Sequence, residues 1–357
     1  MDYKSRIKML RDQFTSNYNA MLVTNLANIR YLCGYSGSNG TLLITKRKAL
    51  FFTDFRYEEQ SKKEVGEAAE IVVIQRNAQK TIYGRIKKLG IKALAIEKSL
   101  PLGKFLDLSK NYSGELVPTE GLVESLRQIK EKEEETFLKK AFSIADNAFA
   151  ELMKVIKPGL TEVEVAAKLE FLMKSQGSSM PSFDTIIASG PNSACPHHQP
   201  TDRVLKKGEM VKIDFGATYK GYHSDMTRTV FLGKASKQFK KIYEIVFEAQ
   251  SKAIAFAKIG VKCSDVDAVA REVIAKAGYG ENFGHGLGHS LGLDIHESPS
   301  LSASCSDIIK ENHIFTFEPG IYLPGWGGIR IEDVYMIKKS KLVRYTNTPN
   351  ELLEISC

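Results

Sequence analysis

The chain has 357 residues, of which 43% are hydrophobic and 26% are charged, and its formal net charge is +8. This length and composition exclude a disordered chain, a collagen and a coiled coil, and they predict two globular domains with separate hydrophobic cores. The five cysteines are scattered and form no C-x-x-C pair, so neither a disulfide framework nor a cysteine zinc site is expected.

The excess of positive charge belongs to the first third of the chain. Residues 1–124 contain 20 Lys and Arg against 13 Asp and Glu, whereas the remainder contains 30 against 29. These basic residues are scattered and are not interleaved with aromatic ones, so no nucleic-acid binding is expected. No apolar run approaches the roughly 18 residues of a membrane span, and the N-terminus lacks the apolar stretch of a secretory signal. We therefore expect a cytoplasmic protein without membrane association.

Residues 1–124 are predicted to form a compact α/β domain. The segment from Ala20 to Phe55 consists of short β-rich runs broken by GYSGSNG and TKRK, which predicts two or three strands joined by turns. Helices are predicted at 58–68 and 78–90, and strands at 71–75 and 93–97. This alternation of strands and helices is typical of α/β domains.

The pattern changes near residue 125, where we place the domain boundary. One long helix is predicted over residues 123–156, and the Lys-Pro-Gly sequence that follows is a stop signal. Thr161 and Glu164 have the spacing of a capping box that begins the next helix. Further helices are predicted at 161–176, 237–258 and 264–277, and β segments at 183–190, 210–219, 222–232, 313–323 and 328–337.

The segment GHGLGHSLGLDIHE contains His285 and His289 four residues apart, which is the spacing of a helical zinc protease motif. That motif requires Glu after the first His, but Gly286 stands there. The four glycines of residues 284–292 would each cost a helix about 1 kcal/mol. We therefore expect a looped or extended segment whose glycines allow close approach of the backbone, with a surface turn carrying incidental histidines as the alternative.

The sequence KIDFGATYKGYHSDMTRT predicts a hairpin with Lys220 and Gly221 as its two-residue turn. In that register Gly216 lies opposite Asp225, and Asp214 shares a face with Asp225. Diagonal partners of this kind lie about 7–8 Å apart, near enough for two carboxylates to bind one ion with Gly216 leaving the space between them open. For an isolated pair, a solvated hairpin face is the alternative.

A similar arrangement is predicted downstream, where Glu318 and Glu332 lie on two β segments joined by a loop centred near Gly325. Folding about that centre brings the two glutamates opposite each other. If His289 adds an imidazole, the four carboxylates and one nitrogen suit two divalent cations such as manganese, cobalt, iron or zinc. Two such cations would lower the pKa of a water molecule enough to make it a nucleophile at neutral pH.

These strings resemble the creatinase, prolidase and aminopeptidase P group, the "pita-bread" metallopeptidases, over about residues 125–350. The similarity is carried by IDFG, SDMTRT, HGLGHSLGLDIHE, FEPGIY and GIRIED, and in the first domain by NIRYLCGYSGSNGTLLIT and FFTDFRY. It implies an α+β fold, in which a smaller N-terminal α/β domain (1–124) precedes a pita-bread catalytic domain (125–357) with a curved antiparallel sheet and flanking helices. It also implies that two metal ions, for which we expect manganese before cobalt, zinc or iron, are bound by Asp214, Asp225, His289, Glu318 and Glu332.

Within this group, the strings PHH, HGLGH and LDIHE are closer to the proline-specific branch. The resemblance implies that His197 lines the substrate site, although the neighbouring His198 leaves the choice between the two open. It further implies that His285 lies near the metals and that His296 assists proton transfer and holds the tetrahedral intermediate. Glu318 is the implied proton acceptor.

Three other residues are interpreted from the sequence. Arg330 stands two residues before Glu332 in an alternating strand, so it should point to the same face. It would either pair with a substrate carboxylate or orient Glu332. We expect His223 and His313 to be structural.

The resemblance thus implies a two-metal exopeptidase, an Xaa-Pro aminopeptidase, that releases the residue before proline from peptides. An Xaa-Pro dipeptidase (prolidase) with the same chemistry is the alternative, and a creatinase-like activity is disfavoured because creatinases lack the metal ligands. A binding protein that kept the fold and lost catalysis is a third reading, but none of the ligands is missing. The family also suggests a homodimer.

Overall fold

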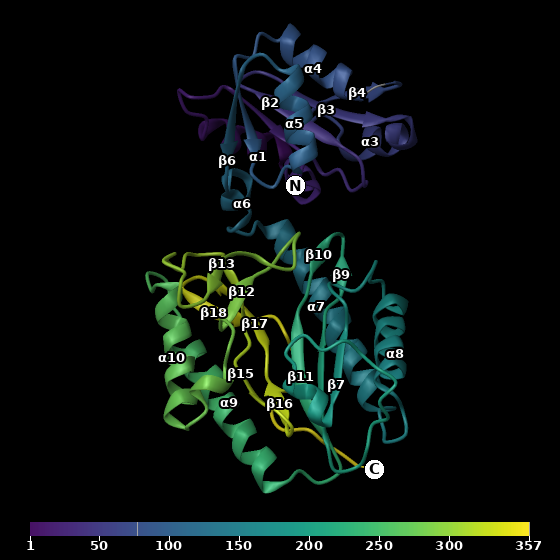
Figure 1. Cartoon of the computed structure of the whole chain (residues 1–357), viewed down its shortest axis with the longest axis vertical. Helices are drawn as coiled ribbons and strands as arrows, with labels where there is room; N and C mark the ends of the chain where they lie inside the picture. The colour runs from purple at the N-terminus through teal and green to yellow at the C-terminus, as the bar shows by residue number, and fades with distance from the viewer. Residues whose placement is uncertain (77, 357) are drawn as a thin grey trace. The chain divides into compact units, whose positions relative to one another are not determined.

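The computed structural model describes residues 1–76 and 78–356 and divides the chain into two compact units, Met1–Arg127 and Gln128–Cys357 (Figure 1). The boundary predicted at residue 125 lies inside helix α6 (Leu122–Arg127). The long helix predicted over 123–156 is wrong, because the chain leaves the helical conformation after Arg127. Helix α7 (Lys132–Met153) begins anew at a capping box formed by Glu131 and Glu134.

The N-terminal unit is built around a six-stranded mixed sheet with the order β4-β3-β2-β1-β5-β6. Strand β1 pairs antiparallel with β2 and parallel with β5, while β3 pairs antiparallel with β2 and parallel with β4. The strands are β1 (Ala20–Val23), β2 (Thr41–Thr45), β3 (Ala49–Asp54), β4 (Glu70–Ile74), β5 (Ala93–Glu97) and β6 (Glu115–Thr119). The helices are α1 (Tyr3–Asp12), α2 (Leu26–Cys33), η1 (Phe55–Tyr57), α3 (Glu58–Glu64), α4 (Ala78–Lys88), α5 (Leu102–Asn111) and α6.

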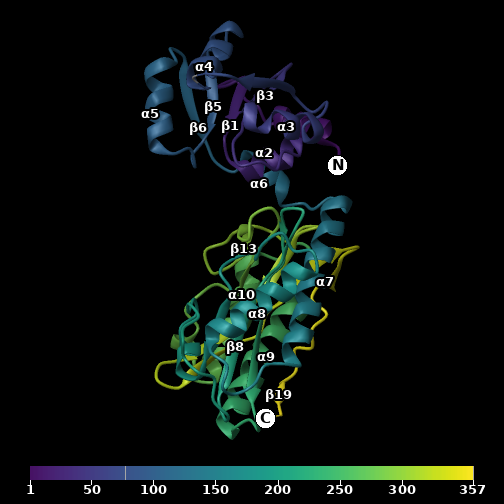
Figure 2. The same ribbon diagram turned by 90° about the vertical axis from the view of Figure 1, so that its right-hand side faces the viewer.

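Two features of this unit explain its local structure. Helices α4 and α5 cover one face of the sheet (Figure 2), where Ile86 and Leu108 pack against Leu22 and Leu43.

The prediction of only strands and turns over 20–55 is wrong at α2. That helix begins where the Asn25 side chain accepts a hydrogen bond from the backbone N–H of Asn28, and it ends at Gly34 in the left-handed conformation.

The C-terminal unit combines several small sheets with two helix pairs. Its larger sheets have the orders β19-β11-β8-β7 and β14-β17-β18, and three hairpins complete it. The helices are α7, α8 (Glu162–Ser175), η2 (Gly190–Ala194), α9 (Lys237–Phe256), α10 (Cys263–Lys276) and η3 (Gly280–Asn282). The strands are β7 (Ile186–Ser189), β8 (Met210–Phe215), β9 (Thr218–Tyr219), β10 (Tyr222–His223), β11 (Met226–Leu232), β12 (Gly288–Ser290), β13 (Glu297–Leu301), β14 (Ile314–Phe317), β15 (Gly320–Leu323), β16 (Gly327–Arg330), β17 (Asp333–Lys338), β18 (Lys341–Arg344) and β19 (Glu354–Ile355).

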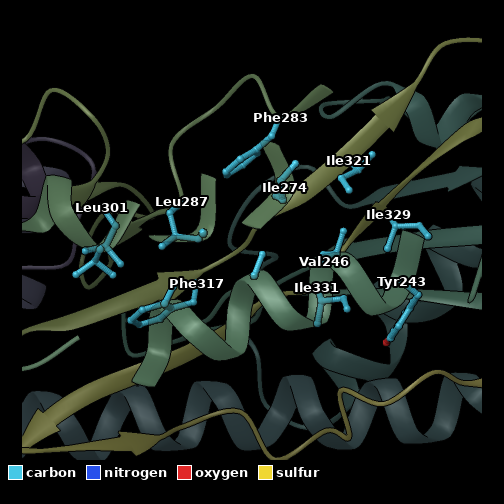
Figure 3. Packing of buried hydrophobic residues seen from close by; sticks show 14 of the residues in the cluster. Tyr243, Val246, Ile274, Phe283, Leu287, Leu301, Phe317, Ile321, Ile329 and Ile331 are labelled. Carbon is cyan, nitrogen blue, oxygen red and sulfur yellow. The ribbon is translucent and has the colours of Figure 1, made fainter. Parts of the chain in front are cut away.

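Each helix pair packs on its own set of strands. Helices α7 and α8 cover β7, β8 and β11, and the rings of Phe149 and Phe215 stack there with centroids 5.9 Å apart. Helices α9 and α10 cover β14 to β17, and Figure 3 shows Val246 of α9 close to Ile329 and Ile331. The strands between the two pairs are therefore held from both sides. Among the described residues, no helix is both long and apolar enough to cross a membrane.

Both hairpins predicted from the sequence have the expected register. In the first, Tyr219 pairs with Tyr222 and Asp214 pairs with Thr227. Lys220 and Gly221 form its turn, and both have a positive φ, as a type I′ turn requires. Gly216 and Asp225 are consequently opposite each other.

The second hairpin extends over two ladders that share one register. Gly320 pairs with Arg330 in the β15–β16 ladder, and Phe317 pairs with Asp333 in the β14–β17 ladder. Glu318 and Glu332 lie between the two ladders, opposite each other. The strand pairing alone therefore brings these two carboxylates together.

Gly216 has a different role from the one predicted. A Cβ atom at this position would lie 1.9 Å from the carbonyl oxygen of Ser224 and 2.8 Å from Oγ of Ser182. Glycine is required here because the two strands approach each other too closely for a side chain. The requirement therefore comes from the neighbouring backbone, and not from a need to keep space open between the carboxylates.

This close approach predicts that Gly216→Ala lowers the free energy of unfolding of the C-terminal unit by about 1–3 kcal/mol, because the extra methyl group forces the strands apart. Urea denaturation followed by tryptophan fluorescence measures the change. Gly284→Ala is the matched control, since no heavy atom lies within 4 Å of a Cβ there. Equal stability of the two variants would contradict the steric explanation.

Candidate metal centre

A cavity of about 490 Å³ lies in the C-terminal unit and gathers all the site residues predicted from the sequence. It is lined by Asp214, Asp225, His197, His285, His289, His296, Glu318, Arg330 and Glu332. These residues come from two hairpins, from the segment around His197 and from residues 285–296, which are far apart in sequence. The structure therefore brings together every predicted site residue, while their roles depend on the geometry described next.

The two aspartates enter the cavity from the first hairpin. Asp214 lies near the end of β8 and Asp225 immediately precedes β11, and their side chains are almost completely buried. Oδ1 of Asp214 has no hydrogen-bond partner among the described residues. A buried carboxylate oxygen without a donor is costly, so the site calls for a cation.

Two threonine hydroxyls hold the glutamates of the second hairpin. Thr227 donates a hydrogen bond of 2.8 Å to Oε2 of Glu332, and Thr316 donates one of 3.2 Å to Oε1 of Glu318. Oε1 of Glu332 is buried and has no partner within the described part of the chain. Each threonine thus fixes one oxygen of its glutamate, and Glu332 keeps the other oxygen available to an ion.

His289, on β12, directs its Nε2 atom at the carboxylates. This atom lies 3.5 Å from Oδ2 of Asp225 and 3.4 Å from Oε1 of Glu318. Its Nδ1 atom lies 3.0 Å from the carbonyl oxygen of Ser290, which can only accept, so the ring proton belongs on Nδ1. The Nε2 lone pair is then free for a metal, and the ligand atoms of Asp225, His289 and Glu332 lie within 4.8 Å of one another.

Burial and mutual repulsion shape the electrostatics of the cavity. Burial raises the pKa of Asp225 well above its ordinary value, and the charges of Asp214 and Glu318 raise it further. The pKa of Glu332 is raised well above its ordinary value for the same reasons, and burial raises that of Glu318. Burial also lowers the pKa of His289, which keeps its ring neutral. Burial and crowding make these carboxylates hard to ionise, and a bound divalent cation would compensate their negative charge. The residues present therefore fit such ions.

The guanidinium of Arg330 lies among these carboxylates, and each of its three nitrogens donates a hydrogen bond within the protein. Nη2 pairs with the Asp214 carboxylate, Nε donates 3.0 Å to Oγ1 of Thr227, and Nη1 donates 2.9 Å to the hydroxyl of Tyr322. The sequence left two roles open for Arg330. These contacts connect it to Asp214 directly and to Glu332 through Thr227, so they favour the orienting role over pairing with a substrate carboxylate.

The remaining histidines differ in their surroundings. His285 accepts a hydrogen bond of 2.9 Å at Nε2 from Tyr322, since its Nδ1 faces the carbonyl of Gly286. The ring of His296 meets that of His289 edge to face, with centroids 4.5 Å apart. His223 and His313 do not line the cavity.

The structure separates His197 from His198. His197 lines the cavity, whereas Nε2 of His198 lies 2.9 Å from Oε2 of the buried Glu162. The same carboxylate accepts hydrogen bonds from Ser189 and Thr201. His198 therefore belongs to a structural network beside the cavity.

A second polar network lies behind Glu332. The next residue, Asp333, faces the opposite side of the strand and pairs with Arg228 at 2.7 Å and with Arg344 at 2.6 Å. Arg228 also donates to the backbone carbonyl of Thr227. This buried network fixes the backbone on which Glu332 and Thr227 stand.

Sequence reasoning missed Thr227, Thr316 and Tyr322. Thr227 stands two residues after Asp225, and Thr316 stands two residues before Glu318, so each shares a strand face with a carboxylate. Tyr322 pairs with Gly328, two residues from Arg330. The two-residue period of a strand was the signal that could have found all three.

Comparison with known proteins assigns the chain to a family. A family model described as metallopeptidase family M24 matches residues 136–339, and one described as the Creatinase/Prolidase N-terminal domain matches residues 6–129. The chain belongs to metallopeptidase family M24. The resemblance and the two-part α+β fold predicted from the sequence are thereby confirmed, and the protein is a metal-dependent peptidase.

Several relatives match this M24 metallopeptidase over nearly their whole length. The uncharacterized peptidase YqhT of Bacillus subtilis is 43% identical over 98% of this chain and 99% of its own. Among solved structures, an Xaa-Pro dipeptidase from Bacillus anthracis has a TM-score of 0.96 and 40% identity, covering 99% of this chain and 100% of the other. An X-Pro aminopeptidase from Thermotoga maritima has a TM-score of 0.90 and 36% identity, with coverages of 98% and 100%.

The candidate metal centre predicts that Asp225→Asn removes at least one bound ion and nearly all peptidase activity, because a neutral amide cannot balance the charge of a cation. Metal content after loading with manganese and desalting, measured by mass spectrometry, checks the first effect. Asp265→Asn, at an exposed position of α10, is the control. Unchanged metal content in the Asp225 variant would show that this carboxylate is no ligand.

The Glu162 network predicts a pH dependence of stability. Burial alone would raise the pKa of Glu162, but hydrogen bonds from His198, Ser189 and Thr201 outweigh it and lower the pKa to about 2. Because this is below the ordinary value of 4.5, ionised Glu162 contributes about 3 kcal/mol above pH 4.5, and the contribution is lost as the pH falls toward 2.

The difference in unfolding free energy between the native protein and Glu162→Gln should therefore be large at pH 6 and shrink as the pH approaches 3. Urea denaturation at several pH values measures it. A difference that does not vary with pH would show that Glu162 is not held ionised.

Proposed function

We propose that the protein is a two-metal Xaa-Pro aminopeptidase, which releases the N-terminal residue from peptides with proline in the second position. The observation that carries the proposal is the cavity lined by four carboxylates, by Nε2 of His289 beside Asp225 and Glu318, and by Arg330. Likeness to solved Xaa-Pro peptidases over nearly the whole chain supports the substrate class.

The residues that would hold the ions are Asp214, Asp225, His289, Glu318 and Glu332. Their four negative charges balance two divalent cations, and their oxygen and imidazole donors suit manganese, with cobalt, zinc or iron as alternatives. When bound, two such ions supply Lewis acidity and an ionised water. The unpartnered oxygens of Asp214 and Glu332 support the assignment, since each lacks a donor among the described residues.

Proton transfer is assigned to Glu318 and two histidines. Glu318 is our candidate for the proton acceptor, because its Oε1 is placed by Thr316 and lies 3.4 Å from Nε2 of His289. His296, beside His289, would stabilise negative charge that develops on the carbonyl oxygen and would help to protonate the leaving nitrogen. His285 would do so only after a change of its contacts, because Nδ1 faces the carbonyl of Gly286 and Nε2 accepts from Tyr322.

Proline in the second position has a direct chemical consequence for the site. Its peptide nitrogen carries no hydrogen, so the substrate offers no N–H donor at the bond to be cleaved. The site therefore cannot use a hydrogen bond from that nitrogen, and it must still deliver a proton to the nitrogen as the bond breaks. His197, at the cavity wall, is our candidate for contact with the substrate on the proline side.

An Xaa-Pro dipeptidase is the second candidate, favoured by the name of the Bacillus anthracis protein with a TM-score of 0.96. The two activities differ in whether the cavity accepts chain beyond the proline. A silent binding protein on the same fold is less well supported, because all five proposed ligands are present. Cytoplasmic location and a homodimer stay predictions.

Substrate length tests the proposal directly. The manganese-loaded protein is expected to hydrolyse Arg-Pro-Pro with a kcat/KM at least comparable to that for Ala-Pro, and to leave Arg-Ala-Pro nearly untouched. Release of the first residue is followed by chromatography. A strong preference for Ala-Pro would favour the dipeptidase, and failure to cleave either Xaa-Pro peptide while binding metal would favour the silent protein.

A further inference from the structure

The segment from Ser189 to Thr201 carries His197 into the cavity with little regular structure of its own. It contains the short 3-10 helix η2 and then turns and irregular chain as far as Thr201. Strand pairing holds only its first residue, Ser189 at the end of β7, and no described ladder holds the rest. Its position must therefore come from contacts with its neighbours.

Lys212 supplies one set of these contacts. Its side chain is completely buried, and it stands on β8 two residues before Asp214. Nζ donates to three backbone carbonyls of the segment, at 3.2 Å to Ser193, 2.6 Å to Cys195 and 3.2 Å to Pro196. The Pro196 carbonyl belongs to the peptide bond that leads into His197, so this contact acts on the histidine's own backbone.

Glu162 supplies a second set from α8. Its carboxylate accepts hydrogen bonds from the backbone and hydroxyl of Ser189, both at 2.7 Å, and from the side chain of Asn192 at 3.0 Å. It also accepts from the hydroxyl of Thr201 at 2.7 Å and contacts His198. Glu162 thus fastens both ends of the segment, and Lys212 fastens its middle.

The segment also lies tightly against β16. A Cβ atom at Gly328 would lie 2.3 Å from the carbonyl oxygen of Ser193, and the Gly328 N–H donates to Oγ of Ser193 at 2.8 Å. The segment therefore has no room to move toward β16. The carbonyl of Ser193 therefore accepts from Nζ of Lys212 and lies directly against Gly328 of β16.

We propose that Lys212 and Glu162 are positioning residues that clamp the Ser189–Thr201 segment and thereby hold His197 at the cavity wall. Burying a polar group is expensive unless it is hydrogen-bonded. Both groups direct their hydrogen bonds to the backbone and side chains of this segment, and Nζ of Lys212 also lies 5.2 Å from the centre of the Tyr322 ring. The effect on substrate binding rests on the proposed function, whereas the effect on the conformation of the segment does not.

The test compares the full-length, manganese-loaded protein with its Lys212→Met variant, which keeps the bulk of the side chain and removes its three donors. We expect kcat/KM for Arg-Pro-Pro to fall about 10- to 100-fold, mainly through a higher KM, with metal content unchanged. Amide hydrogen exchange is expected to accelerate within residues 190–200. Glu162→Gln should give the same exchange pattern from the other side of the clamp.

Two controls separate positioning from general destabilisation. Val246→Ala, in the core between α9 and the strands, should lower stability without changing KM or the exchange of residues 190–200. In a His197→Ala background, Lys212→Met should add little further loss of kcat/KM, because both changes remove the same contact.

Unchanged exchange in residues 190–200 of the Lys212 variant would overturn the clamp, whatever the enzyme cleaves. Full additivity with His197→Ala would show that Lys212 does not act through that histidine. If no Xaa-Pro peptide is cleaved by the native protein, the proposed function fails, and the exchange measurement still decides the clamp.

Discussion

Four carboxylates are crowded into one buried cavity beside the guanidinium of Arg330, and the rest of the site is arranged around this repulsion. Burial and repulsion each oppose their ionisation, as the raised pKa of Asp225 and of Glu332 records. Such an arrangement persists only if the backbone enforces it and a ligand relieves it. Two hairpins provide the enforcement, and divalent cations are the ligands that carboxylate oxygens and a neutral imidazole suit.

Local sequence rules predicted the parts of this site that depend on strand register. The Lys220-Gly221 turn was enough to place Asp214 and Asp225, and the symmetry about Gly325 was enough to place Glu318 opposite Glu332. The approach of one hairpin to the other, and of His289 to both, follows from packing between distant elements. No periodic pattern encodes that packing, so the convergence rested on family resemblance.

The errors have equally local causes. The helical pattern runs through residues 128–131, so the break between α6 and α7 was hidden, although Glu131 and Glu134 have the spacing of the capping box that restarts the helix. Helix α2 was read as strand because its residues are apolar and β-rich. Lys212 and Glu162 were beyond prediction for another reason. Their partners are mostly carbonyls and hydroxyls of an irregular segment, whose path the sequence does not reveal.

The opposite orientations of Glu332 and Asp333 restrict how the gene can change length. One inserted or deleted codon between β16 and β17 would exchange the two side chains, so that Arg228 would meet the wrong neighbour and the cavity would lose an oxygen donor. Within these two hairpins, a change of length is accommodated at the tips, at Lys220-Gly221 and around Gly325, without moving the acidic residues out of register. Descendants of this protein are therefore expected to differ in the size of those tips while the residue count between the acidic groups and their nearest strand ends stays constant.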